Sequence, residues 1–215
     1  MKNNQPEQKG ILCRISTSNS KLGAHIPTVN QPAIITCNRS APCAKCGGCY
    51  ACKGPMAFAN VKSAYIFNMQ SYLRNADSFF NAIDEYLNSG LVIYRFFRWH
   101  SAGDIIDAIY FEKMVELAKK TPLTKFLAFT KKFDIVNNFI DNGGKIPANL
   151  SIVFSAWGDG FQPKNPHGLP VAHIRLKNER VTTIPHRAQE CGGDCSQCQK
   201  CWHLKNGEAV VFNQH

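Results

Sequence analysis

The sequence predicts an α/β protein: a partial (β/α) barrel, TIM-barrel-like, with cysteine-rich loops at the C-terminal ends of its strands. Two observations carry this prediction. Strand-like and helix-like segments alternate along the chain, as they do in parallel sheets with right-handed crossovers. Polar and chemically distinctive loops follow the strands, where the sites of such folds lie. The units are too few for a complete barrel, so about five or six strands are expected. An open α/β sheet is the alternative.

Hydrophobic periodicity and turn residues place the elements in order. Short apolar, β-branched or aromatic runs predict strands at 33–36, 91–99, 125–130, 150–155, 171–176, 181–184 and 209–212. Three- and four-residue spacings of apolar side chains predict helices at 55–75, 77–87, 105–120 and 133–140. Asp77 or Ser78 is the expected N-cap of the second helix.

The chain of 215 residues is 44% hydrophobic and 19% charged, the composition of a folded globular protein. We expect a single domain, with an N-terminal arm at 1–30, the partial barrel at 31–185 and a cysteine-rich segment at 186–215. The polar start contains no signal peptide, and no window reaches the roughly 18 apolar residues of a membrane span. We therefore expect a soluble, cytoplasmic protein with no membrane partner.

Nine of the ten cysteines fall into two groups. In a reducing compartment, cysteines separated by two residues are typical of metal ligands rather than of disulfides. The expected ligands are Cys43, Cys46, Cys49 and Cys52 in the first group and Cys191, Cys195, Cys198 and Cys201 in the second. Cys37, Cys13 and His203 are further candidates, in that order.

The cysteine spacing also indicates the kind of centre. Three or four cysteines from one tight run are typical of iron–sulfur clusters, and the constant spacing matches the C-x2-C-x2-C of bacterial ferredoxins. One or two clusters of the [4Fe–4S] type are therefore expected. One cluster with a structural zinc at the C-terminal group is the alternative, since zinc is held by similar C-x2-C units.

Polar residues follow the later strands of the predicted sheet, at 100–104, 130–131 and 155–160. Because such loops converge on one face of a parallel fold, they extend the site beyond the cysteines. The candidate catalytic residues are His100, Asp104 and Lys131.

Each candidate has a purely structural alternative. Asp104 is a plausible helix N-cap, His100 a plausible core histidine, and Lys131 a plausible solvated helix start. Arg95 and Arg98 interrupt an apolar strand, and buried arginines need anionic partners. One of these arginines is expected to point toward a ligand or toward Asp104.

The formal charge of +10 permits a nucleic-acid partner without demanding one. Thiolate ligands and a negatively charged cluster would make the folded protein less basic than this count. An electron donor is the other expected partner.

Four segments, at 46–51, 100–104, 129–131 and 195–202, together resemble the gene product 88-like family of phage proteins. The likeness covers about residues 20–205. It implies a viral or prophage origin and a location in the cytoplasm of the host cell.

More distantly, the layout resembles the radical S-adenosylmethionine superfamily, whose members have a partial (β/α) barrel. The resemblance implies that Cys43, Cys46 and Cys49 hold a [4Fe–4S] cluster with one open iron. The superfamily spacing is C-x3-C-x2-C, whereas the spacing here is C-x2-C-x2-C. Cys52 is available to fill the open iron, which would leave an electron-transfer or structural centre.

The same resemblance implies that Ser101, Gly103 and Asp104 contact the amino group of S-adenosylmethionine. The expected function is therefore that of an iron–sulfur protein with a redox or radical-type role. The alternative is a zinc module that binds nucleic acid or a host protein through a basic surface.

Overall fold

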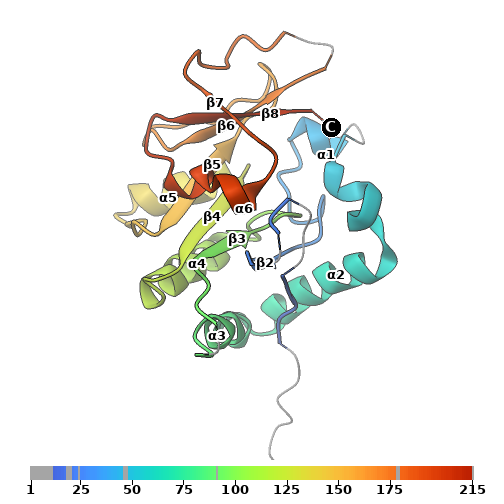
Figure 1. The fold of residues 1–215 in the computed structure, drawn as a ribbon, viewed down its shortest axis with the longest axis vertical. Coiled ribbons are helices and arrows are strands. Elements are labelled where there is room, and N and C mark those ends of the chain that lie inside the picture. The colour runs from blue at the N-terminus through green and yellow to red at the C-terminus, as the bar shows by residue number, and fades with distance from the viewer. Residues whose placement is uncertain are drawn as a thin grey trace, which may run out of the picture.

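The computed structural model describes residues 12–17, 21–23, 25–45, 48–90, 92–177 and 180–214. These residues form an eight-stranded, mostly parallel sheet with helices packed along it (Figure 1). The strands are β1 (Ile15–Ser16), β2 (Thr28–Val29), β3 (Phe96–Trp99), β4 (Lys125–Thr130), β5 (Leu150–Ser155), β6 (Val171–Arg175), β7 (Gln189–Glu190) and β8 (Ala209–Asn213). The predicted α/β class is confirmed.

The helices connect these strands and cover the sheet. The α-helices are α1 (Pro42–Lys45), α2 (Ala59–Arg74), α3 (Ala76–Leu87), α4 (Ala108–Lys120), α5 (Phe133–Asp141) and α6 (Cys195–Cys198). Short 3-10 turns, η1 (Tyr50–Cys52), η2 (Gly54–Ala57) and η3 (Lys200–His203), lie beside the cysteines or lead into α2. Within the described residues, no helix is long and apolar enough to cross a membrane.

The strand order is β1-β2-β3-β4-β5-β6-β8-β7. Strand β1 pairs antiparallel with β2, and the pairs from β2 onward are parallel. The sheet is open, because β1 and β7 stand at its two edges and do not pair with each other. Because β2 to β5 are parallel, their C-terminal ends lie along the same side of the sheet, where the loops that follow them can meet.

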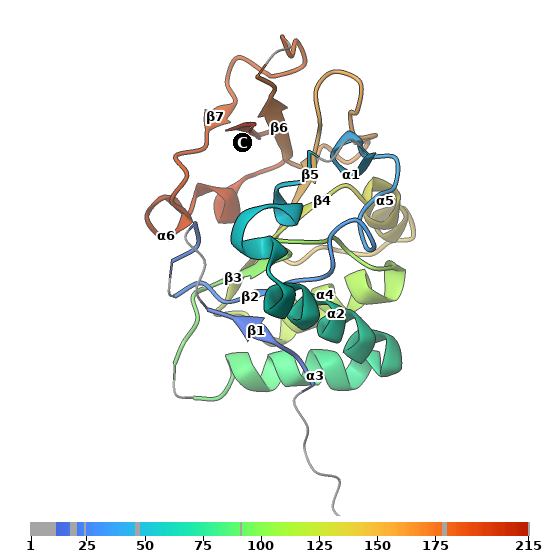
Figure 2. The same ribbon diagram turned by 90° about the vertical axis from the view of Figure 1, so that its right-hand side faces the viewer.

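The sheet separates two apolar layers. Side chains alternate along β4, so Phe126 and Ala128 face the layer of α3, α4 and α5, whereas Leu127 and Phe129 face the opposite layer. Trp202 and three cysteines of the second group pack in that opposite layer. Figure 2 shows α5 and α6 on the two sides of the sheet. The C-terminal cysteine segment therefore covers the face that the longer helices leave uncovered.

Buried aromatic rings fill the helix-covered layer. Tyr110 on α4 is fully buried, and its ring centroid lies 4.8 Å from that of Tyr72 and 5.0 Å from that of Phe80. Both contacts are edge-on, the arrangement that the ring quadrupoles favour. This packing places the Tyr110 hydroxyl beneath the loop that follows β3.

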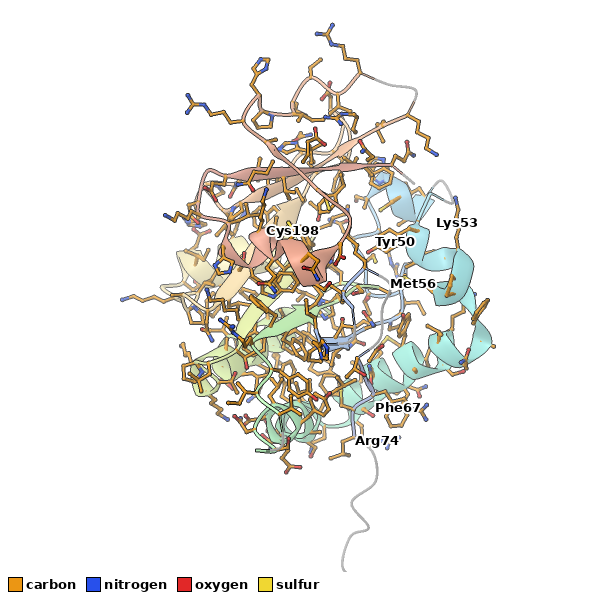
Figure 3. All side chains as sticks on the ribbon, viewed as in Figure 1. Tyr50, Lys53, Met56, Phe67, Arg74 and Cys198 are labelled. Atoms are coloured by element: carbon orange, nitrogen blue, oxygen red, sulfur yellow. The ribbon has the colours of Figure 1, made fainter. Side chains whose placement is uncertain are left out.

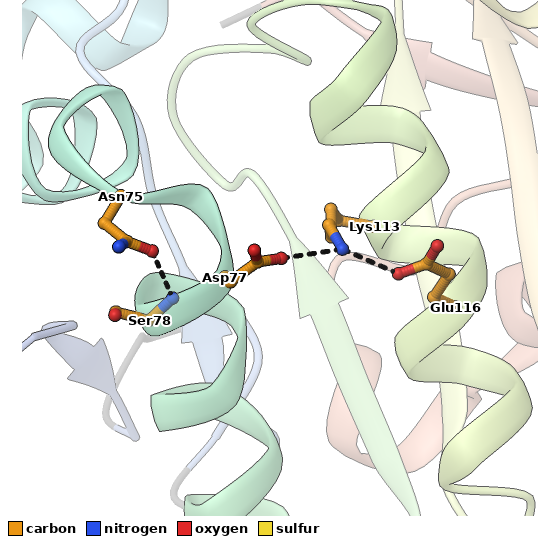
Figure 4. A network of polar contacts seen from close by, with 5 residues as sticks. All are labelled: Asn75, Asp77, Ser78, Lys113 and Glu116. Atoms are coloured by element: carbon orange, nitrogen blue, oxygen red, sulfur yellow. Dashed lines mark hydrogen bonds and ion pairs between the residues drawn. The ribbon is translucent and has the colours of Figure 1, made fainter.

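The start of α3 is capped by a residue that the sequence did not single out. The Asn75 side chain accepts a hydrogen bond from the Ser78 backbone N–H at 2.8 Å, so Asn75 is the N-cap rather than Asp77 or Ser78 (Figure 4). Asp77 lies in the first turn, where a negative charge suits the helix dipole. It also pairs at 2.8 Å with Lys113 of α4, which in turn contacts Glu116 (Figure 4). These pairs are exposed, so they contribute little to stability.

The strand expected at 33–36 is wrong. These residues form a turn in which Ile34 has a φ of 70° and Ile35 is 60% exposed. The Thr36 N–H and hydroxyl both donate to the Pro32 carbonyl, which closes the turn. The strand beside β3 is β2, which lies upstream in the segment expected to be an arm.

Two other strand predictions differ from the structure. The strand expected at 91–99 is shortened to β3, and Val92 and Ile93 before it are 51% and 73% exposed. No strand forms at 181–184, because the N–H groups of Thr182 and Thr183 donate to the Asp159 carboxylate instead of to a neighbouring strand. The edge position beside β8 is taken by β7.

Candidate metal centres

The loops after β2, β3 and β4 meet at the C-terminal ends of these strands. The Tyr50 hydroxyl, from the first cysteine loop, donates to the Ser101 carbonyl at 2.7 Å. The Asn38 side chain, from the same loop, donates to the Lys131 carbonyl at 2.9 Å. These bonds tie the first cysteine loop to the ends of two neighbouring strands, although the three segments are far apart in sequence.

Four thiols of the first group lie within electrostatic reach of one another. Burial raises the pKa of Cys37 to about 11, with added contributions from Asp104, Cys49 and Cys43. The pKa of Cys49 is raised by burial and by the neighbouring Cys52 thiol. Cys43 lies on α1 and Cys52 ends η1. The structure thus brings Cys37 to the other cysteines of its group.

Cys46 lies outside the described residues. Figure 3 labels one residue from each cysteine loop, Tyr50 from the first and Cys198 from the second. The second loop is described throughout its four cysteines.

The four cysteines of the second group line a single small cavity, together with Lys21 and Arg98. All four are free thiols. They are Cys191, Cys195, Cys198 and Cys201. The fold therefore brings the four cysteines, which the sequence spacing groups together, to one cavity.

Backbone hydrogen bonds and one tryptophan position this second group. The Trp202 indole is 5% exposed and donates from Nε1 to the Phe97 carbonyl at 3.0 Å. The Ser151 hydroxyl donates to the Cys201 carbonyl at 3.0 Å, and the Cys195 N–H donates to the Lys21 carbonyl at 2.8 Å. The segment is thus fixed to β3, β5 and the N-terminal region at once.

Two thiols of the second group, those of Cys195 and Cys201, are hard to ionise without a metal. Burial raises the pKa of Cys201 to about 12, and the nearby positive charge of Arg98 opposes this shift. Burial also raises the pKa of Cys195, against the charges of Arg98 and Lys21. A bound metal must therefore displace the thiol protons, as it does at cysteine sites generally.

The donor set can be compared with two kinds of centre. Within the described residues, no group of three or more His, Cys, Asp or Glu side chains is arranged to hold a single metal ion. Tetrahedral zinc with bonds of about 2.3 Å needs sulfurs about 3.8 Å apart. A [4Fe–4S] cluster binds each thiolate to a different iron, so its ligands stand farther apart. Four free thiols that line one cavity have the donor chemistry that either kind of centre uses.

His100 is placed as a core histidine. It is 2% exposed, and its Nε2 lies 3.1 Å from the Tyr110 hydroxyl. That hydroxyl also accepts from the Gln31 side chain at 3.2 Å. Burial lowers the pKa of His100 to about 3, with a smaller contribution from Arg98, so the imidazole is neutral at pH 7. Its Nδ1 has no partner among the described residues.

Asp104 fastens the loop after β3 to the end of β4. Its carboxylate accepts hydrogen bonds from the Thr130 hydroxyl at 2.6 Å, the Lys131 N–H at 2.9 Å and the Ile105 N–H at 2.8 Å. Burial raises its pKa, and these hydrogen bonds oppose the shift. Asp104 is not the N-cap of α4, because Asp107 accepts from the Tyr110 N–H there.

The remaining candidates are Gly103 and Ser101 in this loop and Lys131 after β4, and they also contact other parts of the protein. Gly103 has a φ of 79°, and a Cβ built on it would lie 2.7 Å from the Gln31 carbonyl carbon. The Ser101 hydroxyl lies 3.5 Å from the Thr28 hydroxyl. The Lys131 ammonium lies 5.9 Å from the centre of the Trp157 ring. The loop is therefore tightly packed against the segment that follows β2.

Sequence reasoning missed several residues that build the site. Tyr50 and Asn38 lie inside the first cysteine loop, but nothing in the spacing indicated their bonds to other loops. Trp202 directly follows the last cysteine, which was the available signal for an anchor. Of the two strand arginines, Arg98 faces the second cavity, whereas Arg95 is exposed.

The fold and the two cysteine groups define an α/β protein whose open sheet carries cysteine-rich loops against one edge and one face. The family model described as gene product 88 matches residues 2–204, and the chain belongs to this family. No curated protein and no solved structure matches the chain.

Proposed function

We propose that this protein binds two iron–sulfur clusters, one at each cysteine group, and that it has a redox role. The observation that carries the proposal is the second cavity, which is lined by four free thiols and by the cationic side chains of Lys21, Arg98 and Lys200. The cations offset the negative charge that four thiolates bring to a cluster. The layout of a partial barrel, with its site at the strand ends, is part of the same proposal.

The first group supplies five candidate ligands for a centre that needs four. They are Cys37, Cys43, Cys46, Cys49 and Cys52. Cys52 lies near enough to Cys49 to raise its pKa, which supports Cys52 as a ligand of the same centre. We therefore favour a closed [4Fe–4S] centre in which every iron has a protein ligand.

When bound, the clusters would supply one-electron transfer. The residues of this chain would bind and enclose them. Trp202 holds the second group against β3, while Tyr50 and Asp104 fasten the loops around the first. The required partner is an electron donor that can approach the strand ends.

A radical-type role would need one iron without a protein ligand. S-adenosylmethionine would bind that iron, and Ser101, Gly103 and Asp104 would hold its amino group, as the more distant resemblance implies. The Asp104 carboxylate, however, already accepts three hydrogen bonds inside the protein. We expect S-adenosylmethionine to leave the electron paramagnetic resonance spectrum of the reduced protein unchanged. A changed spectrum with cleavage of the cofactor would assign the radical role instead.

The test of the main proposal is metal analysis of anaerobically purified protein. We expect a brown protein with about eight irons and about eight acid-labile sulfides per chain, from two four-iron clusters. The variant Cys195→Ser/Cys198→Ser should lose about half of both. The matched control is Cys13→Ala. Cys13 is a lower-ranked candidate ligand on sequence, but it belongs to neither group and packs against the helix-covered layer. This control should keep the full content.

A colourless protein with stoichiometric zinc and no sulfide would reject the proposal and favour the zinc module. Iron that survives serine replacement in both groups would also reject it, because the metal would then be bound elsewhere.

A second candidate function is nucleic-acid binding through a basic surface. A cavity of about 670 Å³ lies on the side of the sheet away from the first cysteine loop, near the N-terminal ends of β4 and β5. It is lined by Lys125, Lys145, Lys205, His167 and His203, and no Asp or Glu is among the described residues that line it. Cations gathered without carboxylates favour an anionic partner.

This candidate predicts salt-dependent affinity for labelled DNA or RNA, because phosphate contacts release counterions. The variant Lys145→Ala/Lys205→Ala should weaken binding and reduce the salt dependence. Lys119→Ala/Lys120→Ala, at the end of α4, removes the same charge away from the cavity and is the control. Equal weakening by both variants would assign the binding to net charge rather than to this cavity.

A further inference from the structure

Arg98 lies on β3, on the face of the sheet that carries the second cysteine group. Its guanidinium carbon is 4.4 Å from the centre of the Phe129 ring, a cation–π contact that fixes the plane of the group. Its Nε donates to the Trp99 carbonyl at 3.2 Å. None of the ion pairs between described residues includes Arg98. The side chain is therefore a half-buried cation that has a fixed position but no carboxylate partner.

Arg98 lines the same cavity as the four cysteines of the second group. A half-buried arginine is stabilised by an anionic partner, and thiolates bound to a cluster would supply that negative charge.

The other charged groups around the cavity do not satisfy Arg98. The Glu190 carboxylate pairs with Arg175 at 2.6 Å. The Asp194 carboxylate caps α6 through the Ser196 N–H at 2.9 Å. Lys21 and Lys200 add positive charge, and the Lys21 ammonium lies 4.7 Å from the centre of the Phe212 ring. The balance of charge at this wall is positive.

We propose that Arg98 is the counter-ion of the second cluster, and that it tunes the reduction potential of that cluster. This inference rests on the proposed function. Reduction adds one electron from a one-electron donor and breaks no bond, so the centre gains one negative charge. A fixed cation stabilises the reduced form more than the oxidised form and raises the potential. Arg98 thus changes the reduction potential of the cluster through its charge.

The test compares Arg98→Met, which removes the charge but keeps an apolar stem against Phe129, with Arg98→Lys, which keeps the charge. Arg95→Met is the matched control, because Arg95 is exposed just before the same strand. Iron and sulfide are counted first. The potential of the signal that Cys195→Ser abolishes is then measured by anaerobic titration.

In Arg98→Met we expect the equilibrium constant for reduction to fall about tenfold, a shift of 59 mV to lower potential for a one-electron couple. Arg98→Lys and Arg95→Met should stay near the wild-type value. Loss of the second cluster from Arg98→Met but not from Arg98→Lys would also support the role of the charge.

An Arg98→Met protein with full iron content and the potential of the Arg95→Met control would overturn the inference. Loss of the cluster from both Arg98 variants would overturn it too, because packing rather than charge would then be responsible. If the wild type and the control contain no iron and no sulfide, the proposed function itself has failed. The iron count therefore separates the two failures.

Discussion

The conformation of the loop after β3 requires a glycine at position 103. Its φ of 79° disfavours any side chain, and a Cβ would meet the Gln31 backbone. Gly143 provides a matched control, since its φ is 85° but nothing lies within 4 Å of a Cβ built there. We expect Gly103→Ala to lower the free energy of unfolding by about 2–4 kcal/mol and Gly143→Ala by about 1 kcal/mol. Urea unfolding measures both, and equal losses would show that the contact with Gln31 is unimportant.

His100 links stability to pH. The pKa of His100 in the folded protein is about 3, far below its usual value. As the pH falls, the imidazole is therefore protonated in the unfolded chain before it is protonated in the folded chain. The histidine therefore stabilises the fold fully above pH ~6.5, and this contribution is lost progressively toward pH 3. Asn tolerates the positive φ of 55° at this position.

Between pH 7.5 and 5, the wild type should lose about 2 kcal/mol more of its free energy of unfolding than His100→Asn does. Urea titrations at each pH measure this difference. Parallel losses in the two proteins would mean that the imidazole titrates normally in the folded state. His173 and His203, whose pKa values burial also lowers, are present in both proteins and cancel.

At the scale of elements, Trp202 holds η3 and the second cysteine group against the sheet. Trp202→Ala should lower the free energy of unfolding by about 3–5 kcal/mol, because it leaves a cavity beside Phe96 and an unpaired Phe97 carbonyl. Trp202→Phe keeps an aromatic ring but loses the Nε1 hydrogen bond, and should cost about 1–2 kcal/mol. His203→Ala, on the exposed side of the same turn, is the control and should stay within about 0.5 kcal/mol.

Trp202→Ala should also release iron from the second group and leave the first group loaded. Iron retained in both groups despite the loss of stability would show that the cysteines hold their segment without the tryptophan.

The sequence predicted buried strands more accurately than exposed segments. Strands β4 and β5 were predicted with their observed bounds, because each is a central strand with an uninterrupted apolar run. The apolar run at 33–36 was misassigned because Ile34 and Ile35 are exposed and the backbone closes onto Pro32. Strand β2 has only two residues, and its burial comes from neighbours that a local pattern does not show.

The candidate site was predictable where the signal was local. The spacing identified the cysteines, and the structure brings the second group to one cavity. The partners of Asp104 and Arg98 were not predictable, because Thr130 and Phe129 reach them only through the pairing of β3 with β4. Sequence distance gave no indication of these contacts.

On the scale of the whole molecule, two separate cysteine groups lie on one sheet. The first group is fastened at the strand ends, and the second covers the face opposite α3, α4 and α5. Each group has its own anchors, so replacing the cysteines of one group should leave the other group in place.

The most direct measurement is the Mössbauer spectrum of anaerobically purified, 57Fe-enriched protein, compared with that of Cys195→Ser/Cys198→Ser. We expect the iron of the wild type to be in clusters, and we expect the variant to keep about half of it, with the spectrum of the remaining cluster. Iron present only as mononuclear sites, or a chain that holds zinc and no iron, would show that the two cysteine groups do not bind iron–sulfur clusters.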